Sequence, residues 1–456
     1  MENPHSEPLN PPTAAFACIG SQQGHHHPSI RPPSQGPSRA VPRPCPDSVN
    51  QSFRRSLGRF PIEQAAPASI GNAMHLTGSF HPSQRVLLGP GPSDVPARVL
   101  HAMAAPTLGH LDPEYLALMD DTRRQLQAIF RTANDLTLAI SGTGSAGMEA
   151  VVVNLVEPGD EAIVCVNGVF GTRMKDVMER AGATVHAIDV PWGETIPPER
   201  VADALRSFPR AKVLGIVHAE TSTGAHQPLE EISRLVHAAG ALFLVDAVTS
   251  LGGLPLEVDA WGIDACYSGT QKCLSCPPGL APVTFSPRAL ARMDARRSKV
   301  QSWYLDMTMI RNYWGADRAY HHTAPINMTY ALREACAIIL EEGLDTRIAR
   351  HSLNHRALRA GLEAIGLHYI PSQSLTTLNA IHAPDGIDEA LIRRRLLSEF
   401  GIEIGAGLGP FKSRALRIGL MGSSSTRRNV QLVLAALEII LTRSGATSAA
   451  ASIYAA

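Results

Sequence analysis

The stretch Leu136-Thr-Leu-Ala-Ile-Ser-Gly-Thr-Gly-Ser-Ala-Gly-Met-Glu149 indicates the fold class of this chain. The apolar residues of Leu136–Ile140 predict a buried strand. A turn with glycines at 142, 144 and 147 follows, and the next residues predict a helix over Ala146–Leu155. A strand, a glycine-rich turn and a helix form a βα unit, which is typical of a parallel sheet.

The same alternation continues along the chain. Further strands are expected at Glu161–Val166, Thr184–Ile188, Val213–His218, Leu242–Asp246, Ala265–Ser268 and Pro282–Phe285. Helices are expected between them at Arg173–Ala181, Pro198–Ser207 and Leu229–Ala239. Continuous apolar strands separated by helices indicate a parallel sheet that is covered on both faces. We therefore predict an α/β fold, with a mainly parallel seven-stranded sheet in a large domain over 95–345.

From about residue 346 the pattern changes to a smaller α+β arrangement. The expected elements are helices over Thr346–Ala364, Ile387–Glu399 and Arg427–Leu441, and strands over Leu375–Ile381, Glu403–Gly405 and Ala415–Ile418. We expect a small C-terminal domain over 346–445 and an extended arm over 74–94. The alanine- and serine-rich residues 446–456 are expected to form a frayed tail.

Residues 1–73 differ in composition from the rest, with many prolines and arginines and the triplet His25-His26-His27. Such composition is typical of a disordered tail, and we interpret the histidines as part of it rather than as a metal site. A translation start at Met74 is an alternative. Import into an organelle through this segment is a second reading, less favoured than a cytoplasmic location because the prolines disrupt an amphipathic helix.

Composition excludes several classes of protein. The 456 residues carry 41 basic and 41 acidic side chains, so the strongly basic face of a nucleic-acid binder is not expected. The apolar runs are too short for a membrane span. Seven cysteines do not make a disulfide scaffold, and a reducing compartment is expected. Cys273 and Cys276 supply two of the four ligands that a zinc site needs, so no metal is predicted, and packing is favoured over a redox role.

Three strand ends carry residues suited to chemistry. The glycine-rich turn at 142–147 fits a phosphate site at a helix N-terminus, a dinucleotide site, or a turn without a ligand. Asp246 ends an apolar strand, where it either faces a ligand or caps a following helix through Ala247–Ser250. Lys272 follows Tyr267-Ser-Gly-Thr-Gln271 and is either a surface lysine or a desolvated amine. An anion site, a carboxylate and a lysine in this order match the needs of pyridoxal phosphate.

The ordered motifs resemble the class V, fold-type I aminotransferases, in particular the alanine–glyoxylate and serine–pyruvate aminotransferase group. The segments that carry the resemblance are Leu88–Ser93, Ser141–Gly144, Met148–Ala150, Leu155–Asp160, Glu220–Gly224, Val245–Asp246, Ser268–Lys272, Pro277–Gly279, Tyr320–Thr323 and Leu416–Gly419. They span nearly the whole chain from about Leu87 to Leu441. The implied fold is that of fold-type I pyridoxal phosphate transferases.

The resemblance implies a role for each matching residue. Lys272 would bind the cofactor aldehyde, Asp246 would pair with the pyridinium nitrogen, and Thr221 would hydrogen-bond near the phenolic oxygen. Thr143, Gly144 and Gln271 would hold the phosphate. Ser145 and Phe170 stand where animal members have a histidine and a ring-stacking tryptophan. Tyr320 and Thr323 would reach the phosphate of a partner subunit in a homodimer.

The substrate side of the site is implied in the same way. Arg417, between Leu416 and Ile418, suits a substrate carboxylate, although a structural ion pair is the alternative from the residues alone. Pro90 and Gly91 would line the substrate mouth through their backbone. The implied reaction moves an amino group from L-alanine or L-serine to glyoxylate. The small-molecule partners are therefore amino acids and 2-oxo acids.

Other functions remain as alternatives. A ureidoglycine-dependent relative has an asparagine before its His-His pair and a glutamine before its Phe-Asp-Pro run, where this chain has Tyr320 and His110. A desulfurase needs a cysteine on a mobile loop, and Cys165 and Cys336 fall in an expected strand and helix. A nicotinamide-dependent dehydrogenase using Gly142–Gly147 and a binding protein without activity are more distant alternatives.

Overall fold

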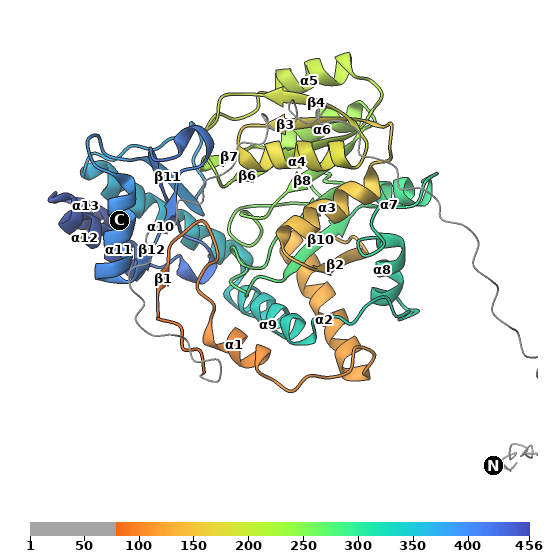
Figure 1. Ribbon diagram of the computed structural model, residues 1–456, viewed down its shortest axis with the longest axis horizontal. Helices are drawn as coiled ribbons and strands as arrows, with labels where there is room; N and C mark the ends of the chain where they lie inside the picture. The colour runs from red at the N-terminus through yellow and green to blue at the C-terminus, as the bar shows by residue number, and fades with distance from the viewer. Residues whose placement is uncertain (1–78) are drawn as a thin grey trace, which may run out of the picture. The chain divides into compact units, whose positions relative to one another are not determined.

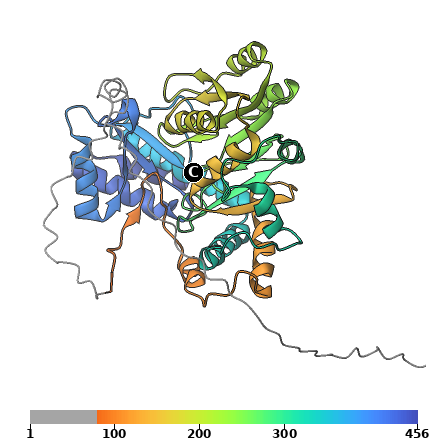
Figure 2. The ribbon, with the colours of Figure 1, turned by 45° about the vertical axis from the view of Figure 1, so that its right-hand side comes forward.

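The computed structural model describes residues 79–456, so the predictions for residues 1–73, including the histidine triplet, lie outside the described part. Residues 81–456 form one compact unit, in which a large lobe and a smaller C-terminal lobe are visible (Figures 1 and 2). Within the described residues, each helix is too short or too polar to span a membrane.

A seven-stranded sheet forms the centre of the large lobe. Its strands, in spatial order, are β2 (Leu136–Ser141), β10 (Leu280–Phe285), β9 (Ala265–Tyr267), β8 (Leu242–Asp246), β5 (Ala211–Val217), β3 (Glu161–Val166) and β4 (Thr184–Asp189). Only β10 runs antiparallel to its neighbours in this sheet. All seven strands were predicted, with ends that differ by at most two residues, because strands buried on both faces are continuously apolar.

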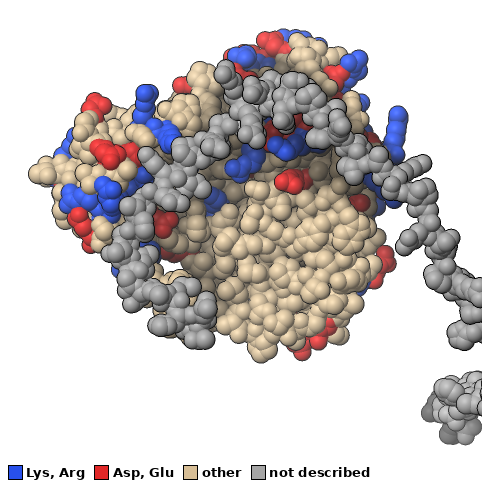
Figure 3. All heavy atoms as spheres, in the orientation of Figure 1, with Lys and Arg blue, Asp and Glu red and all other residues tan. Residues whose placement is uncertain are grey.

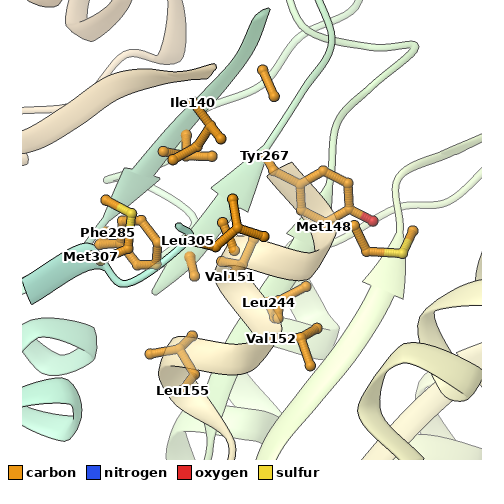
Figure 4. Packing of buried hydrophobic residues seen from close by; sticks show 14 of the residues in the cluster. Ile140, Met148, Val151, Val152, Leu155, Leu244, Tyr267, Phe285, Leu305 and Met307 are labelled. Carbon is orange, nitrogen blue, oxygen red and sulfur yellow. The ribbon is translucent and has the colours of Figure 1, made fainter. Parts of the chain in front are cut away.

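Helices cover both faces of the sheet. They are α1 (Ala97–Met103), α2 (Pro113–Phe130), α3 (Gly144–Leu155), α4 (Val169–Arg180), α5 (Pro198–Ser207), α6 (Glu230–Ala238), α7 (Pro287–Asp294), α8 (Met307–Trp314) and α9 (Ile326–Glu342). Each face of the sheet has its own buried apolar cluster. Figure 4 shows α3 in one of them, where Met148 and Val151 lie among residues of the sheet such as Ile140 and Tyr267. This packing fixes the start of α3 at the end of β2.

The small lobe contains a three-stranded antiparallel sheet. The sheet has the order β11 (Leu378–His382), β14 (Ala415–Gly419) and β13 (Gly405–Ala406). The lobe's helices are α10 (Leu344–Ala364), α11 (Glu389–Phe400) and α12 (Arg427–Leu441). The arm contributes β1 (Val86–Leu87), which pairs in parallel with β12 (Ile402–Glu403) of this lobe. The arm is thereby attached to the small lobe while it leads into the large lobe (Figure 2).

The prediction of a frayed tail over 446–456 is wrong. Residues Ala446–Ala455 form helix α13, with Ala446 and Ala450 fully buried. The backbone of Ala446 lies so close to α10 that a Cβ added at Gly361 would be 2.8 Å from its carbonyl oxygen. The Tyr454 hydroxyl also donates to Asn354 Oδ1 over 2.8 Å. Small side chains allow this close approach, so the composition that suggests fraying instead supports helix packing.

Candidate active site

A cavity lies where the carboxyl ends of the parallel strands meet, as expected for a ligand site in an α/β sheet. The loops after β2, β5, β8 and β9 all supply residues to it. Its lining contains eight predicted site residues, Thr143, Gly144, Ser145, Phe170, Thr221, Asp246, Gln271 and Lys272. Five further lining residues had no predicted role, namely Met148, Arg173, Ala219, Val248 and Tyr267. The tertiary structure thus brings most of the predicted cofactor residues into one cavity.

Lys272 lies beneath the arm, and its amine donates a hydrogen bond to the Pro90 carbonyl oxygen. Burial and, to a smaller extent, the nearby positive charge of Arg417 together lower the pKa of Lys272 to about 8. A lysine with this pKa is partly neutral near neutral pH, which a nucleophile or a proton acceptor requires. The surface-lysine alternative is therefore wrong for this residue.

Asp246 ends β8 and is buried, with a relative exposure of 3%. One oxygen accepts a hydrogen bond from the Val248 amide over 2.8 Å, and the other accepts one from the Tyr267 hydroxyl over 2.7 Å. Burial raises the pKa of Asp246 to about 6, while these hydrogen bonds and the positive charge of Lys272 oppose the shift. The residue lines the cavity, as one alternative predicted. The helix expected through Ala247–Ser250 is absent, and Asp246 instead accepts a hydrogen bond within a turn there.

Arg417 reaches from the small lobe to the edge of the cavity. Its Nε donates to the Ala406 carbonyl over 2.6 Å, and its Nη1 donates to the Thr221 carbonyl over 3.0 Å. The side chain is buried, which lowers its pKa to about 10. These bonds to neutral carbonyls leave the guanidinium charge available to an anion, unlike the structural ion pair that was the alternative.

The arm crosses directly over Lys272. The Ser93 amide donates to the Gln271 carbonyl over 2.9 Å, and the Ser93 hydroxyl donates to the Lys272 carbonyl over 2.7 Å. Gly91 has φ +104°, and a Cβ there would be 2.6 Å from the Lys272 side chain. Only glycine fits at this position, because both the backbone conformation and the space exclude a side chain. Pro90 and Gly91 therefore lie against the Lys272 side chain, although neither is among the residues that line the cavity, and their role at the substrate mouth stays a prediction.

Comparison with known proteins now decides the family. The profile described as "Aminotransferase class-V" matches residues 85–433. The chain belongs to the class V aminotransferases. It is 42% identical to the alanine–glyoxylate aminotransferase of Callithrix jacchus, over 77% of this chain and 86% of that protein. It is 39% identical to the (S)-ureidoglycine–glyoxylate transaminase of Bacillus subtilis, over 79% of this chain and 92% of that protein.

Solved structures agree with this membership. The crystal structure of an alanine–glyoxylate aminotransferase from Nostoc sp. is 48% identical, with a TM-score of 0.78 over 80% of this chain and 97% of that chain. The ureidoglycine–glyoxylate aminotransferase structure from Bacillus subtilis has a TM-score of 0.81 at 39% identity, over 83% of this chain and 100% of that chain. The dehydrogenase alternative is therefore wrong, and the fold-type I prediction is confirmed.

The residues of the cavity fit pyridoxal phosphate, the cofactor of class V aminotransferases. Gln271 lines the cavity, and its Oε1 is buried without a hydrogen-bond partner among the described residues, so the wall beside it suits a polar ligand. The first turn of α3 begins at Gly144, where free N–H groups and the helix dipole favour a phosphate. Asp246 suits a protonated ring nitrogen, and the Lys272 amine suits the aldehyde.

Tyr320 and Thr323 do not reach the cavity of their own chain. Tyr320 is 59% exposed, with its ring centre 5.0 Å from that of His110, and Thr323 is exposed as well. Nearby, His322 Nε2 lies 2.7 Å from Ser141 Oγ, at the end of β2. The role that the resemblance implies for Tyr320 and Thr323, toward a partner subunit, stays a prediction.

Two residues near the site were missed by the sequence analysis. Arg173 lines the cavity, and its guanidinium lies 5.0 Å from the centre of the Phe170 ring. The helix was expected to begin at Arg173, whereas α4 begins at Val169 and so places Phe170 and Arg173 three residues apart on one face. Tyr267 stands in the quoted Lys272 motif, but its bond to Asp246 depends on the pairing of β8 with β9.

Proposed function

We propose that this class V aminotransferase moves the amino group of L-alanine or L-serine to glyoxylate. Alanine would leave as pyruvate, serine would leave as hydroxypyruvate, and glyoxylate would leave as glycine. The observation that carries the proposal is that Lys272 and Asp246 line one cavity, with the buried Arg417 bonded to the carbonyl of Thr221, another lining residue. The negative charge of Asp246 suits the cofactor ring nitrogen, and the positive charge of Arg417 suits a substrate carboxylate.

When bound, pyridoxal phosphate supplies an aldehyde carbon for the amino group and a protonated ring that draws electrons from the substrate Cα. Asp246 keeps the ring nitrogen protonated, because a buried carboxylate stabilises a cation beside it. Arg417 binds the substrate carboxylate and thereby orients Cα toward Lys272. The Lys272 amine would accept and hold the proton that leaves the substrate Cα.

The walls near Lys272 favour small substrates. The backbone at Gly91 leaves no room for a Cβ beside the lysine. On the opposite side of the arm, a Cβ added at Gly405 would lie 2.4 Å from Pro90, so the arm is pressed against β13. Glyoxylate has no side chain and alanine has a single methyl group, so both suit a narrow entrance.

Ureidoglycine is a second candidate donor, because the Bacillus subtilis relative that is 39% identical bears the name (S)-ureidoglycine–glyoxylate transaminase. The two positions that differ from that branch, Tyr320 and His110, lie in contact in this structure. The rings of Tyr320 and His110 stand where the resemblance gives the ureidoglycine branch an asparagine and a glutamine. This difference favours alanine or serine as the donor.

The test is a matrix of donors and acceptors on the purified protein loaded with pyridoxal phosphate. L-alanine, L-serine and (S)-ureidoglycine are each combined with glyoxylate, pyruvate and hydroxypyruvate. We expect glycine from glyoxylate with alanine or serine. If glycine forms only with ureidoglycine as the donor, the protein belongs with the ureidoglycine-dependent branch. If no donor and acceptor pair gives amino transfer, the proposal is overturned.

A homodimer whose partner completes each site belongs to this proposal. Figure 3 shows a wide face with few charged side chains over α2, α3 and α9. Trp303 and Tyr320 are 63% and 59% exposed, which is unusual for large aromatic residues. If Tyr320 serves the partner's site, a mixture of inactive Lys272→Ala and weakened Tyr320→Ala proteins regains activity, because one hybrid site has both residues. Failure to regain activity in exchanged hybrids would contradict the shared site.

The cellular location belongs to the proposal as well. We place the protein in the cytoplasm, with import into an organelle as the alternative. The five cysteines within residues 79–456 are free and buried, which agrees with a reducing compartment. Fractionation of cells that express the full chain tests this placement.

A further inference from the structure

The first turn of α4 is capped by a different segment of the chain. Its N-terminal flanking residue, Gly168, has no side chain to accept hydrogen bonds from the helix. The Val169 amide instead donates to Ser222 Oγ over 3.0 Å. The amides of Phe170 and Gly171 donate to one oxygen of Glu220 over 3.1 and 3.2 Å. Three N–H groups that a helix leaves free at its start are thus satisfied from the loop after β5.

Glu220 is fully buried and bonded at both oxygens. Its relative exposure is 0%. Its second oxygen accepts hydrogen bonds from the Ser222 amide over 3.1 Å and from the Ser222 hydroxyl over 2.5 Å. Burial raises the pKa of Glu220 to about 6, and these hydrogen bonds act against the shift. A buried carboxylate with four donors around it is a constructed arrangement, since burial without them is costly.

The space around Gly168 allows no local cap. A Cβ at this position would lie 2.4 Å from Glu220 Cδ and 2.5 Å from Ser222 Oγ. Serine, aspartate and asparagine, which usually cap helices, are therefore excluded there. The position of the α4 start consequently depends on Glu220 and Ser222.

This first turn carries cavity residues. Phe170 and Arg173 both line the cavity, and Thr221, between the two capping residues, lines it from another side. The Phe170 amide donates a hydrogen bond to the Glu220 carboxylate, so the carboxylate holds the backbone of the residue whose ring lines the cavity. The charged groups that act on Glu220 and its surroundings are Asp246, which raises its pKa, and Arg417, whose own pKa Glu220 raises.

We propose that Glu220, together with Ser222, is a positioning residue that fixes Phe170 and Arg173 against the ring of the bound cofactor. The inference rests on the proposed function and on the ring-stacking position that the resemblance implies for Phe170. Glu220 touches neither cofactor nor substrate in this arrangement. It acts through the start of α4.

The first experiment measures the binding of pyridoxal phosphate to cofactor-free protein, by the visible absorbance band of the bound form. Glu220→Gln should raise the dissociation constant about tenfold, because the amide has one acceptor oxygen where backbone donors face both oxygens of the carboxylate. Ser222→Ala is a milder variant and should raise it about threefold. Glu199→Gln removes an exposed carboxylate from the first turn of α5 and serves as the control, with no change expected.

The second experiment separates positioning from general destabilisation. The effect of Glu220→Gln is measured alone and in a Phe170→Leu background. If Glu220 acts through Phe170, the loss of affinity in the double variant is smaller than the product of the two single losses. The circular dichroism of the bound cofactor should also change in Glu220→Gln, since it reports the asymmetry of contacts around the ring.

The outcomes are distinct. Multiplicative losses, or wild-type affinity and dichroism in Glu220→Gln and Ser222→Ala, would overturn the positioning role and leave the proposed function intact. Failure of the wild-type protein to bind pyridoxal phosphate would overturn both. If Glu220→Gln does not fold, Ser222→Ala with unchanged affinity overturns the inference by itself.

Discussion

The Tyr267 hydroxyl donates a hydrogen bond to the Asp246 carboxylate, with 2.7 Å between the oxygens. The two residues face each other in register on neighbouring parallel strands, β8 and β9. Burial raises the pKa of Asp246 to about 6, and the Tyr267 proton limits the shift because it stabilises the charged carboxylate. Tyr267 therefore helps to set the pH above which Asp246 is charged.

Tyr267→Phe should raise the pKa of Asp246 further. Cofactor affinity is expected to increase as pH rises through about 6 in the wild type, because the ring nitrogen pairs with the ionised carboxylate. In Tyr267→Phe this rise should move to higher pH. Binding of pyridoxal phosphate between pH 5 and 8 measures the shift. Tyr369→Phe, which removes a tyrosine bond to Asn379 in the small lobe, is the control and should leave the profile unchanged.

The stability of the cofactor-free protein should depend on pH in the opposite sense. The pKa of Asp246 is higher in the folded protein than its ordinary 3.8, so the folded state holds more protons between about pH 4 and 6. Its contribution to the free energy of unfolding therefore falls as pH rises through this window. Urea unfolding of wild type and Asp246→Asn across the window measures it. An equal pH dependence in both proteins would contradict the raised pKa.

Lys272→Ala should abolish covalent capture of pyridoxal phosphate and the reaction. In the wild type, the rate of capture should rise with pH and level off above about 8, because the neutral amine attacks the aldehyde. Rapid-mixing absorbance of cofactor-free protein with pyridoxal phosphate measures this rate. The exposed Lys212 provides the control variant Lys212→Ala, which should behave as wild type. A midpoint near the ordinary lysine pKa of 10.5 would rule out the buried environment.

Arg417→Ala should weaken both substrates, since each carries a carboxylate. Loss of a charge-assisted bond of about 2 kcal/mol corresponds to a rise in KM of roughly 30-fold. The pKa of Lys272 should also rise, because Arg417 lowers it in the wild type. Steady-state kinetics with alanine and glyoxylate, and the capture rate against pH, measure the two effects. Arg414 is an exposed arginine nearby in the sequence, and Arg414→Ala is the control. If Arg417→Ala and the wild type have equal KM values, Arg417 does not bind the substrate carboxylate.

The docking of α13 predicts a stability effect remote from the cavity. Ala450 is fully buried in the small-lobe core, so Ala450→Leu should overpack it and lower the free energy of unfolding by about 1–3 kcal/mol. Ala455→Leu places the same side chain at an exposed position of the same helix and should have little effect. Urea unfolding compares the two. Equal free energies of unfolding for the two variants would contradict the docking of α13 and support the frayed tail first predicted for residues 446–456.

The sequence by itself determined those features that depend on local pattern. The strands of the large sheet were predicted because buried parallel strands are continuously apolar. The start of α3, Asp246 and Lys272 were found because each follows such a strand, and the ends of parallel strands gather on one edge of a sheet. The order of these motifs was enough to predict pyridoxal phosphate, and the resemblance of the quoted segments pointed to the class V family.

Only the tertiary structure decided the features that join segments distant in sequence. Glu220 caps a helix about 50 residues earlier, and neither residue carries a local signal of the other. The alanine-rich end becomes a helix because Gly361 and Ala446 let two helices approach. The pKa values of Lys272 and Asp246 likewise follow from burial beneath other segments, which composition and spacing do not encode.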